Sequence, residues 1–164
     1  MAFDAFLKIE GIKGESTDSG HKDQIEVLSY SHSVAQQGGA AVSRGGGQTG
    51  GRADLGDFSI VKVLDLASAN LFKYCANGKH IPSVVLELVS ADENPHVYMK
   101  YTLSDVVVSS VRPGGSSNGE GTRPLEEVSF RYSKIEQEYT PFDNTGKAGA
   151  AIKAGWDLAT NKAL

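Results

Sequence analysis

The fold is decided by two stretches of sequence: residues 96–111, HVYMKYTLSDVVVSSV, and residues 125–139, LEEVSFRYSKIEQEY. Both are rich in β-branched and aromatic residues, which favour strands, and both are far longer than the usual strand of about five or six residues. They are joined by residues 112–124, RPGGSSNGEGTRP, whose glycines and prolines predict an irregular loop. Two long strands tied by one loop indicate a barrel wall or an extended sheet, not an α/β enzyme with a pocket.

The alternation of apolar and polar residues changes phase part-way along both long strands. In the first strand the apolar series runs to Leu103 and resumes at Val106, and in the second it runs to Tyr132 and resumes at Ile135. A paired change of phase is what a β-bulge produces, and bulges bend strands so that a sheet can curl. We therefore expect both strands to bend within a barrel.

The rest of the chain predicts shorter strands and one helix, from the period of its apolar residues. The expected elements are strands at residues 3–9, 25–34, 57–64, 82–90 and 156–158, a helix at residues 65–78, and a long flexible loop at residues 36–56. Residues 1–164 are most simply one domain. We expect a mostly-β fold, a small β-barrel of two curled, mainly antiparallel sheets with one flanking α-helix.

The expected helix has signals at both ends. Asp65 or Ser68 can cap its N-terminus, and Asn77-Gly78 can end it. Five residues recur at the spacing of one helical face: Ser68, Leu71, Phe72, Cys75 and Ala76. We expect this face to be buried, with Cys75 in a packing role.

Composition excludes several classes of function. The net charge is −4, and the 16 basic and 20 acidic residues are interspersed. Because no block of Lys and Arg stands out, we expect neither nucleic-acid binding nor a polybasic membrane patch. No apolar run approaches the roughly 20 residues of a membrane helix, so we expect no membrane insertion.

The N-terminal sequence and the single cysteine bear on localisation. Cys75 has no partner for an intramolecular disulfide, which fits folding in a reducing compartment. Residues 1–8, MAFDAFLK, lack the basic start and the apolar core of a secretory signal peptide. We expect synthesis in the cytoplasm and, if the protein is exported, a route without a cleavable leader.

Two glycine motifs resemble catalytic or cofactor motifs but lack their context. Residues 45–50, GGGQTG, match the dinucleotide pattern, yet a strand and not a helix is expected after them. Residues 115–119, GSSNG, match a nucleophile elbow around Ser117, yet they join two strands. A Ser117 hydrolase stays a minor alternative, and we expect no enzyme and no cofactor.

The acidic and histidine residues also predict no reaction centre. The four histidines show no ligand-like spacing, so no metal site is expected, and Asp18 and His21 more plausibly cap a turn. Glu126 and Glu127 point to opposite faces of a strand, so they cannot act together on one bond.

Three stretches, taken in order, resemble the hemolysin-coregulated protein (Hcp) family, the tube protein of bacterial type VI secretion systems. The first combines FLKI at residues 6–9 with GESTD at 14–18, His21 and IEV at 25–27. The second combines VVSSV at residues 107–111, the Gly/Ser loop, and PLEEVSFRYSKI at 124–135. The third combines YTP at residues 139–141 with GWD at 155–157 and Asn161-Lys162. The helix with Cys75, Gly78 and Pro82 fits as well. The resemblance spans the chain except for residues 36–56.

The resemblance implies a small β-barrel flanked by a helix and assembled into hexameric rings. The rings of such proteins stack into a hollow tube that a contractile sheath expels, tipped by a spike protein, and some members hold effectors in the lumen. Sheath, spike and effectors are therefore the expected partners. The alternative is a soluble effector-binding or chaperone module, or an adhesin, that forms no tube.

Two sets of residues are candidates for these contacts. Ser29, Ser31 and Ser33 lie on one strand face, and their small hydroxyls suit a solvated lumen wall or a polar effector contact; the alternative is an ordinary exposed face. The loop at residues 36–56 is the candidate for inter-ring stacking because its glycines let the backbone pair with a neighbour; the alternative is an idle surface loop. The stacking candidates are Gly45, Gly46, Gly47, Gln48, Thr49, Gly50 and Gly51.

Overall fold

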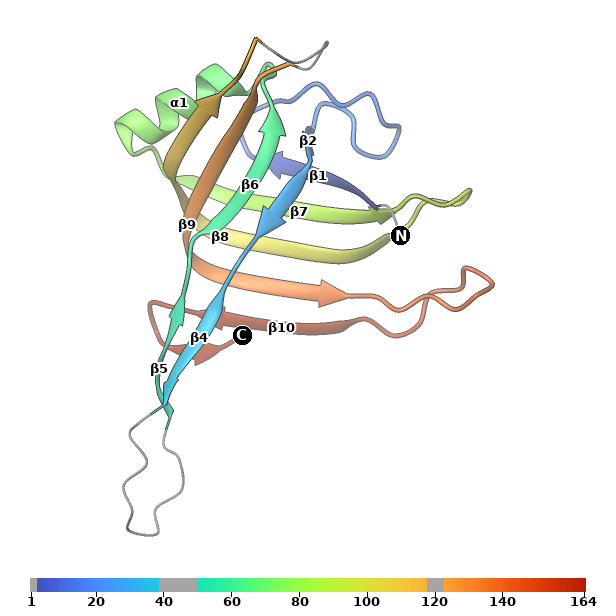
Figure 1. Cartoon of the computed structure of the whole chain (residues 1–164). Helices are drawn as coiled ribbons and strands as arrows, with labels where there is room; N and C mark the ends of the chain where they lie inside the picture. The colour runs from blue at the N-terminus through green and yellow to red at the C-terminus, as the bar shows by residue number, and fades with distance from the viewer. Residues whose placement is uncertain (1–2, 39–49, 118–122) are drawn as a thin grey trace.

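A computed structural model describes residues 3–38, 50–117 and 123–164 (Figure 1). The chain is mostly β, with one helix among the described residues. The strands are β1 Phe3–Ile9, β2 Ile25–Val27, β3 Ser29–Ser31, β4 Val34–Gly38, β5 Gly50–Leu55, β6 Phe58–Val63, β7 Ile81–Ser90, β8 Val97–Gly114, β9 Leu125–Tyr139, β10 Ile152–Asp157 and β11 Lys162–Ala163, and the helix is α1 Ser68–Asn77.

The two long predicted strands form one antiparallel pair. β8 has 18 residues and β9 has 15, and they pair from Met99 opposite Tyr139 to Gly114 opposite Leu125. Pairing therefore continues through residues 112–114, which the sequence placed in the loop. The predicted end of this strand, at Val111, was therefore wrong. Pro113 and Gly114 make the stretch look irregular in the sequence, but β9 lies beside it and pairs with it.

Both long strands bend where the apolar pattern changes phase. Leu103 pairs with Ile135 and Val106 with Tyr132, and all four side chains are buried. Between them Asp105 has a positive φ of 52°, which is rare for a residue other than glycine. A further register shift lies between Val108 and Ser110. Figure 1 shows the two halves of β8 and β9 running in different directions, as expected.

The bend lets one strand serve two neighbours. The first half of β9 pairs with β6, from Leu125 to Phe130, and its second half pairs with β10, from Lys134 to Tyr139. The nine-stranded sheet continues from β9 through β8, β7 and β1 to β2, while β3 pairs with β6. Since β2 and β3 are separated only by Leu28, the sheet curls back toward its own start. The expected single strand at residues 25–34 is thus divided so that its parts pair with different neighbours.

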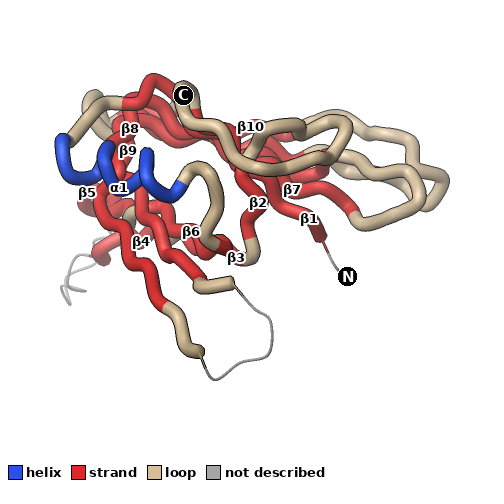
Figure 2. Tube along the Cα trace, turned by 90° about the horizontal axis from the view of Figure 1, so that it is seen from above, coloured by secondary structure: helices blue, strands red, loops and turns tan. Residues whose placement is uncertain are grey.

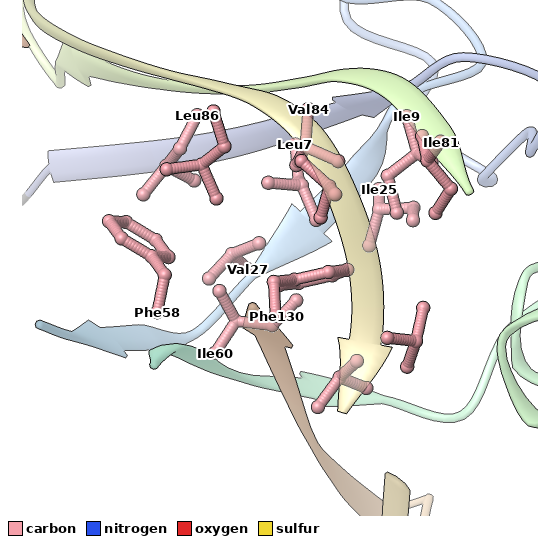
Figure 3. Packing of buried hydrophobic residues seen from close by; sticks show 14 of the residues in the cluster. Leu7, Ile9, Ile25, Val27, Phe58, Ile60, Ile81, Val84, Leu86 and Phe130 are labelled. Atoms are coloured by element: carbon pink, nitrogen blue, oxygen red, sulfur yellow. The ribbon is translucent and has the colours of Figure 1, made fainter. Parts of the chain in front are cut away.

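The curled sheet encloses an apolar core. Phe58, Ile60, Ile25 and Phe130 are fully buried, and Leu7 is nearly so. Figure 3 shows side chains from β1, β2, β6, β7 and β9 pointing toward one another. Burying each such side chain contributes about 1.5–3 kcal/mol relative to exposure.

The helix packs against β8 through a narrow face. Leu71 is buried, but Phe72 is 67% exposed, and Cys75 is half-buried at the edge of the core. Ala76 is exposed as well, so the expectation of a wide buried face was wrong at Phe72 and at Ala76. The expected C-terminal cap is confirmed, because Gly78 is left-handed, with φ 64°, and its N–H donates to the Tyr74 carbonyl.

A buried polar cluster fixes the N-terminal end of the helix. Lys62 Nζ lies 2.8 Å from Asp65 Oδ1 and 2.9 Å from Glu126 Oε2, and the Ser68 hydroxyl donates to the same Glu126 oxygen at 2.9 Å. Asp65 Oδ1 also accepts from the Ala67 N–H at 2.9 Å. The N-cap residue is Ala67, and no side chain caps the helix, so the predicted caps were wrong: Ser68 is the first helical residue, and Asp65 bonds to the Ala67 N–H in the turn that precedes the helix.

The described ends of the region predicted as one flexible loop are two paired strands, the β4–β5 hairpin. β4 and β5 form a separate two-stranded antiparallel sheet, from Val34 opposite Leu55 to Gly38 opposite Gly50. The sequence hid these strands because Gly, Ala and Gln have low strand propensity, and because neither strand buries an apolar face. Residues 39–49 lie outside the described part of the chain.

Candidate assembly surfaces

The hairpin β4–β5 projects from the curled sheet in Figure 1, and Figure 2 looks down on the molecule from above, with the helix in blue. Its strands pair with each other and with no other strand of the described residues, so their outer edges carry main-chain groups open to a partner. The geometry of the hairpin therefore depends on what holds its base.

The base of the hairpin is held by a hydrogen-bonded set from three elements. The Tyr132 hydroxyl, on β9, donates to the carbonyl of Gly56 at 2.9 Å, and the Gly56 N–H donates to the carbonyl of Ser33 at 2.9 Å. His32 Nε2 lies 2.7 Å from the same hydroxyl oxygen. Because that hydroxyl already donates to Gly56, His32 must donate through Nε2–H. We call His32, Gly56 and Tyr132 the hairpin lock.

Gly56 is required by close packing in the lock. A Cβ atom at this position would collide with the Ser33 hydroxyl. Glycine at this position thus lets the backbone that leaves the hairpin lie directly against Ser33, at the entry to the hairpin.

Aromatic rings pack around the lock, and burial shifts the pKa values of its groups. The His32 ring stacks on Phe58, with centroids 5.6 Å apart, and Tyr30 stacks on the same ring at 5.9 Å. Burial lowers the pKa of His32. Burial, with a smaller contribution from Asp57, raises the pKa of Tyr132 to about 12, and burial also raises the pKa of Tyr101.

A pocket of about 430 Å³ separates the hairpin from the end of β9 and from β10. Trp156, the one tryptophan of the chain, lines it together with Val34 and Leu55 of the hairpin. Across the opening, the Arg52 guanidinium donates to the carbonyl of Leu158 at 2.5 Å. The hairpin is therefore tethered at two points, at its base and near its middle.

The three predicted lumen serines are exposed and lie at the entry to this hairpin. Ser29 and Ser31 belong to β3, and Ser33 follows it. Their exposure agrees with the sequence prediction, but a lumen is not defined by one chain, so their role stays a prediction.

The pairing of strands extends this face in a way the sequence did not reveal. Ser31 pairs with Ser59, Ser59 with Ser129, and Ser129 with Ser110, across β3, β6, β9 and β8. The hydroxyl oxygens of Ser59 and Ser129 are 2.8 Å apart. We call these four residues the serine row. Only the strand register could have shown it, since its members are far apart in sequence.

The predicted stacking residues are only partly described. Gly50 and Gly51 are the first residues of β5, where Gly50 pairs with Gly38 and the Gly51 carbonyl accepts from the Gln36 side chain. Gly45, Gly46, Gly47, Gln48 and Thr49 lie outside the described residues. A dinucleotide site needs a helix after these glycines, and β5 stands there instead.

The other residues that the sequence analysis considered as possible reactive or metal-binding sites lie in turns and strands. Ser117 is exposed in a turn after β8, so the strand-to-helix turn of a nucleophile elbow is absent from the residues described there. Asp18 Oδ1 accepts from the Gly20 N–H at 3.0 Å and lies 2.8 Å from His21 Nδ1, which confirms the turn role. Glu126 is buried and Glu127 is exposed, so the two side chains point to opposite faces of β9, as predicted. In the described ranges no cluster of three metal-ligating side chains was found.

Comparison with known proteins decides the family. A family model described as "Type VI secretion system effector, Hcp" matches residues 6–139. The chain belongs to this Hcp family. It is 37% identical to the protein hcp1 of Pseudomonas aeruginosa over 163 residues, which is 98% of each chain.

Solved Hcp structures share the whole fold. A structure described as a type six secretion system protein superposes with a TM-score of 0.93 at 34% identity, covering 99% of this chain and 100% of that one. Hcp1 from Salmonella typhimurium gives 0.82 at 41% identity, with both chains fully covered. The Hcp fold predicted from three sequence stretches is therefore confirmed. No helix in the described residues is long and apolar enough to cross a membrane.

Proposed function

We propose that this Hcp-family chain is the tube component of a type VI secretion system. Identical chains assemble into hexameric rings, and the rings stack into a hollow tube that is expelled from the cell. The observation that carries this proposal is the projecting β4–β5 hairpin with free main-chain edges, on a chain that belongs to the Hcp family.

A ring requires a head-to-tail contact that closes by rotation, and such contacts need apolar anchors. Ile152 and Tyr139 pair across β10 and β9, and both are largely exposed, at 69% and 48%. Val34, on the hairpin, is 61% exposed. Apolar side chains left open at a strand end and on a hairpin are suited to burial against the next subunit.

Stacking requires a second head-to-tail contact that does not close. The hairpin, including the predicted residues 45–51, is suited to this contact because a free strand edge can add to a neighbouring sheet. The exposed Ser29, Ser31 and Ser33 are the proposed lumen wall and effector contact, and the half-buried Ser59 and Ser110 of the serine row continue this face. The spike protein and the sheath of the secretion system are the other proposed partners.

Electron microscopy of negatively stained protein tests the proposal. Annular particles with an open centre, and stacks of them at high concentration, are the expected result. Compact particles that bind an effector without forming rings would instead support the soluble effector-binding alternative and would overturn the tube proposal.

A further inference from the structure

Residues 13–24 lie in the loop, blue in Figure 1, that joins β1 to β2, and they cover an apolar side chain on the outer face of the sheet. Phe6 of β1 points away from the core, because it alternates with Ala5 and Leu7, which belong to the core cluster. Phe6 is nevertheless only 7% exposed. The His21 ring lies over it, nearly parallel, with 4.3 Å between the ring centroids. We call residues 13–24 the strap.

His21 is itself buried, and both of its ring nitrogens face carboxylate oxygens. Nδ1 lies 2.8 Å from Asp18 Oδ1, within the strap, and Nε2 lies 2.9 Å from Glu87 Oε2, on β7. An ionised carboxylate accepts hydrogen bonds and cannot donate them, so each contact needs an N–H from the ring. A neutral imidazole has one N–H, and the doubly protonated ring has two. The two contacts together therefore require an imidazolium.

Both carboxylates have further partners that favour their ionised form. The second oxygen of Glu87, Oε1, lies 3.2 Å from Lys100 Nζ on β8. Asp18 Oδ1 also accepts from the Gly20 N–H at 3.0 Å. The hydrogen bond from His21 is the largest of the causes that hold the pKa of Asp18 below its ordinary 3.8. Both acids are therefore treated as charged at neutral pH.

The neighbouring elements add more acidic than basic groups around the ring, and nearby acidic groups also favour a cation. These groups are Asp4 and Lys8 of β1, Glu26 of β2, which is the register partner of Phe6, and Lys22 and Asp23 of the strap.

We propose that His21 is held as an imidazolium, and that this cation is the clamp that fixes the strap to β7 over Phe6. A second ion pair of the strap joins Glu15 Oε2 to Arg123 Nη1 at 3.7 Å, but these side chains are 52% and 71% exposed, and such pairs contribute little. The clamp does not depend on the proposed tube function.

Nuclear magnetic resonance of wild-type protein tests the charge of the ring. The four histidines are labelled with ¹⁵N, and long-range ¹H–¹⁵N correlations at pH 7.5 distinguish a protonated ring nitrogen from a bare one. The signals that disappear in His21→Phe assign the His21 ring. Two protonated nitrogens are expected in this ring, and a bare nitrogen at this pH would overturn the proposal.

Hydrogen exchange at the same pH, followed by mass spectrometry, tests the positioning role. Backbone bonds inside the strap protect its amides, such as the Gly14 N–H to the Asp23 carbonyl at 2.8 Å. His21→Phe keeps a ring over Phe6 but removes both N–H groups, so exchange in residues 13–24 is expected to become about ten-fold faster, the usual effect of losing a hydrogen bond to a charged group. Glu87→Ala removes the anchor on β7 and is expected to accelerate the same residues.

Two references show whether the effect is local. His80→Gln removes an exposed histidine that faces one carboxylate, that of Asp105, and is expected to leave the strap at its wild-type rate. The β6 residues Phe58–Val63 are expected to exchange at the wild-type rate in every variant. Far-UV circular dichroism verifies folding, and Glu87→Ala decides the positioning role if His21→Phe does not fold.

Faster exchange confined to the strap supports the clamp. Wild-type exchange of the strap in the folded His21 and Glu87 variants would overturn it. Equal acceleration in the strap and in β6 would also overturn it, because the strap would then open only with the whole sheet.

Discussion

Lys62 and Glu126 face each other across β6 and β9 as a buried ion pair, with 2.9 Å between Nζ and Oε2 and with 0% and 2% of their side chains exposed. Asp65 and Ser68 complete the contacts of both groups. The pair ties the start of the helix to the curled sheet, and its burial makes it sensitive to removal of either partner.

Lys62→Met is expected to lower the free energy of unfolding by about 3–5 kcal/mol, because it leaves the Glu126 carboxylate buried without its cation. Urea unfolding measures the loss. Lys134→Met is the matched control: its Nζ lies 3.8 Å from Asp157 and its side chain is 49% exposed, so a loss below about 1 kcal/mol is expected.

The double variant Lys62→Met with Glu126→Leu is expected to recover most of that stability, because it removes both charges. Equal losses of unfolding free energy in Lys62→Met and Lys134→Met would show that the buried ion pair matters no more for stability than the exposed one.

Asp157 gives the fold a defined dependence on acid. Hydrogen bonds from the backbone of Thr160 and Ala159 hold the pKa of this carboxylate below its ordinary 3.8, with a smaller contribution from Lys134. Its stabilising effect is therefore complete above pH 3.8 and is lost as the pH falls through the lowered pKa. Asp157→Asn is expected to melt below wild type at pH 7, with the gap closing toward pH 2. A gap that is the same at both pH values would contradict the ionic role.

The long strands, the bend and the helix end could be predicted from sequence because each depends on local pattern. The phase change at Leu103 and Val106 is visible in the order of residues, and Gly78 is the residue type that a left-handed cap favours. The family was also predictable, from short stretches that keep their order along the chain.

The buried Lys62, the hairpin strands and the serine row could not be predicted in this way. Each depends on which strands become neighbours, and strand register is a property of the whole sheet. Lys62 and Glu126 are far apart in sequence, and the sequence around each predicts an exposed charged residue on a strand. Phe72, at the expected helical face, is exposed because α1 contacts β8 along a narrower stripe than its apolar residues suggest.

Ser31→Arg tests the proposed lumen wall. Ser31 is exposed, so the folded chain and its rings are expected to tolerate the change, with an effect on unfolding of less than about 0.5 kcal/mol. Retention of a co-expressed effector on the purified rings is expected to fall, because a long cation replaces a small hydroxyl. Ser19→Arg adds the same charge on an exposed turn and is expected to retain the effector. Loss of the rings in Ser31→Arg would place this face at a subunit contact instead.

Deletion of residues 45–51 tests the proposed stacking role of the hairpin. The change shortens β5 but leaves the paired bases of β4 and β5 near Val34 and Leu55 in place. Rings are expected to form and tubes to be lost, as counted by electron microscopy. Deletion of residues 118–122, in the other glycine-rich loop, serves as the control and is expected to leave the tube yield unchanged. Tubes at wild-type yield after the first deletion would remove these residues from the stacking contact.

Light scattering on purified protein tests ring formation most directly, because it gives a particle mass in solution. The expected mass is six times the 17.4 kDa of the chain, with larger multiples as the concentration rises. A mass of one chain at every protein and salt concentration would contradict assembly into rings and, with it, the proposed role in a tube.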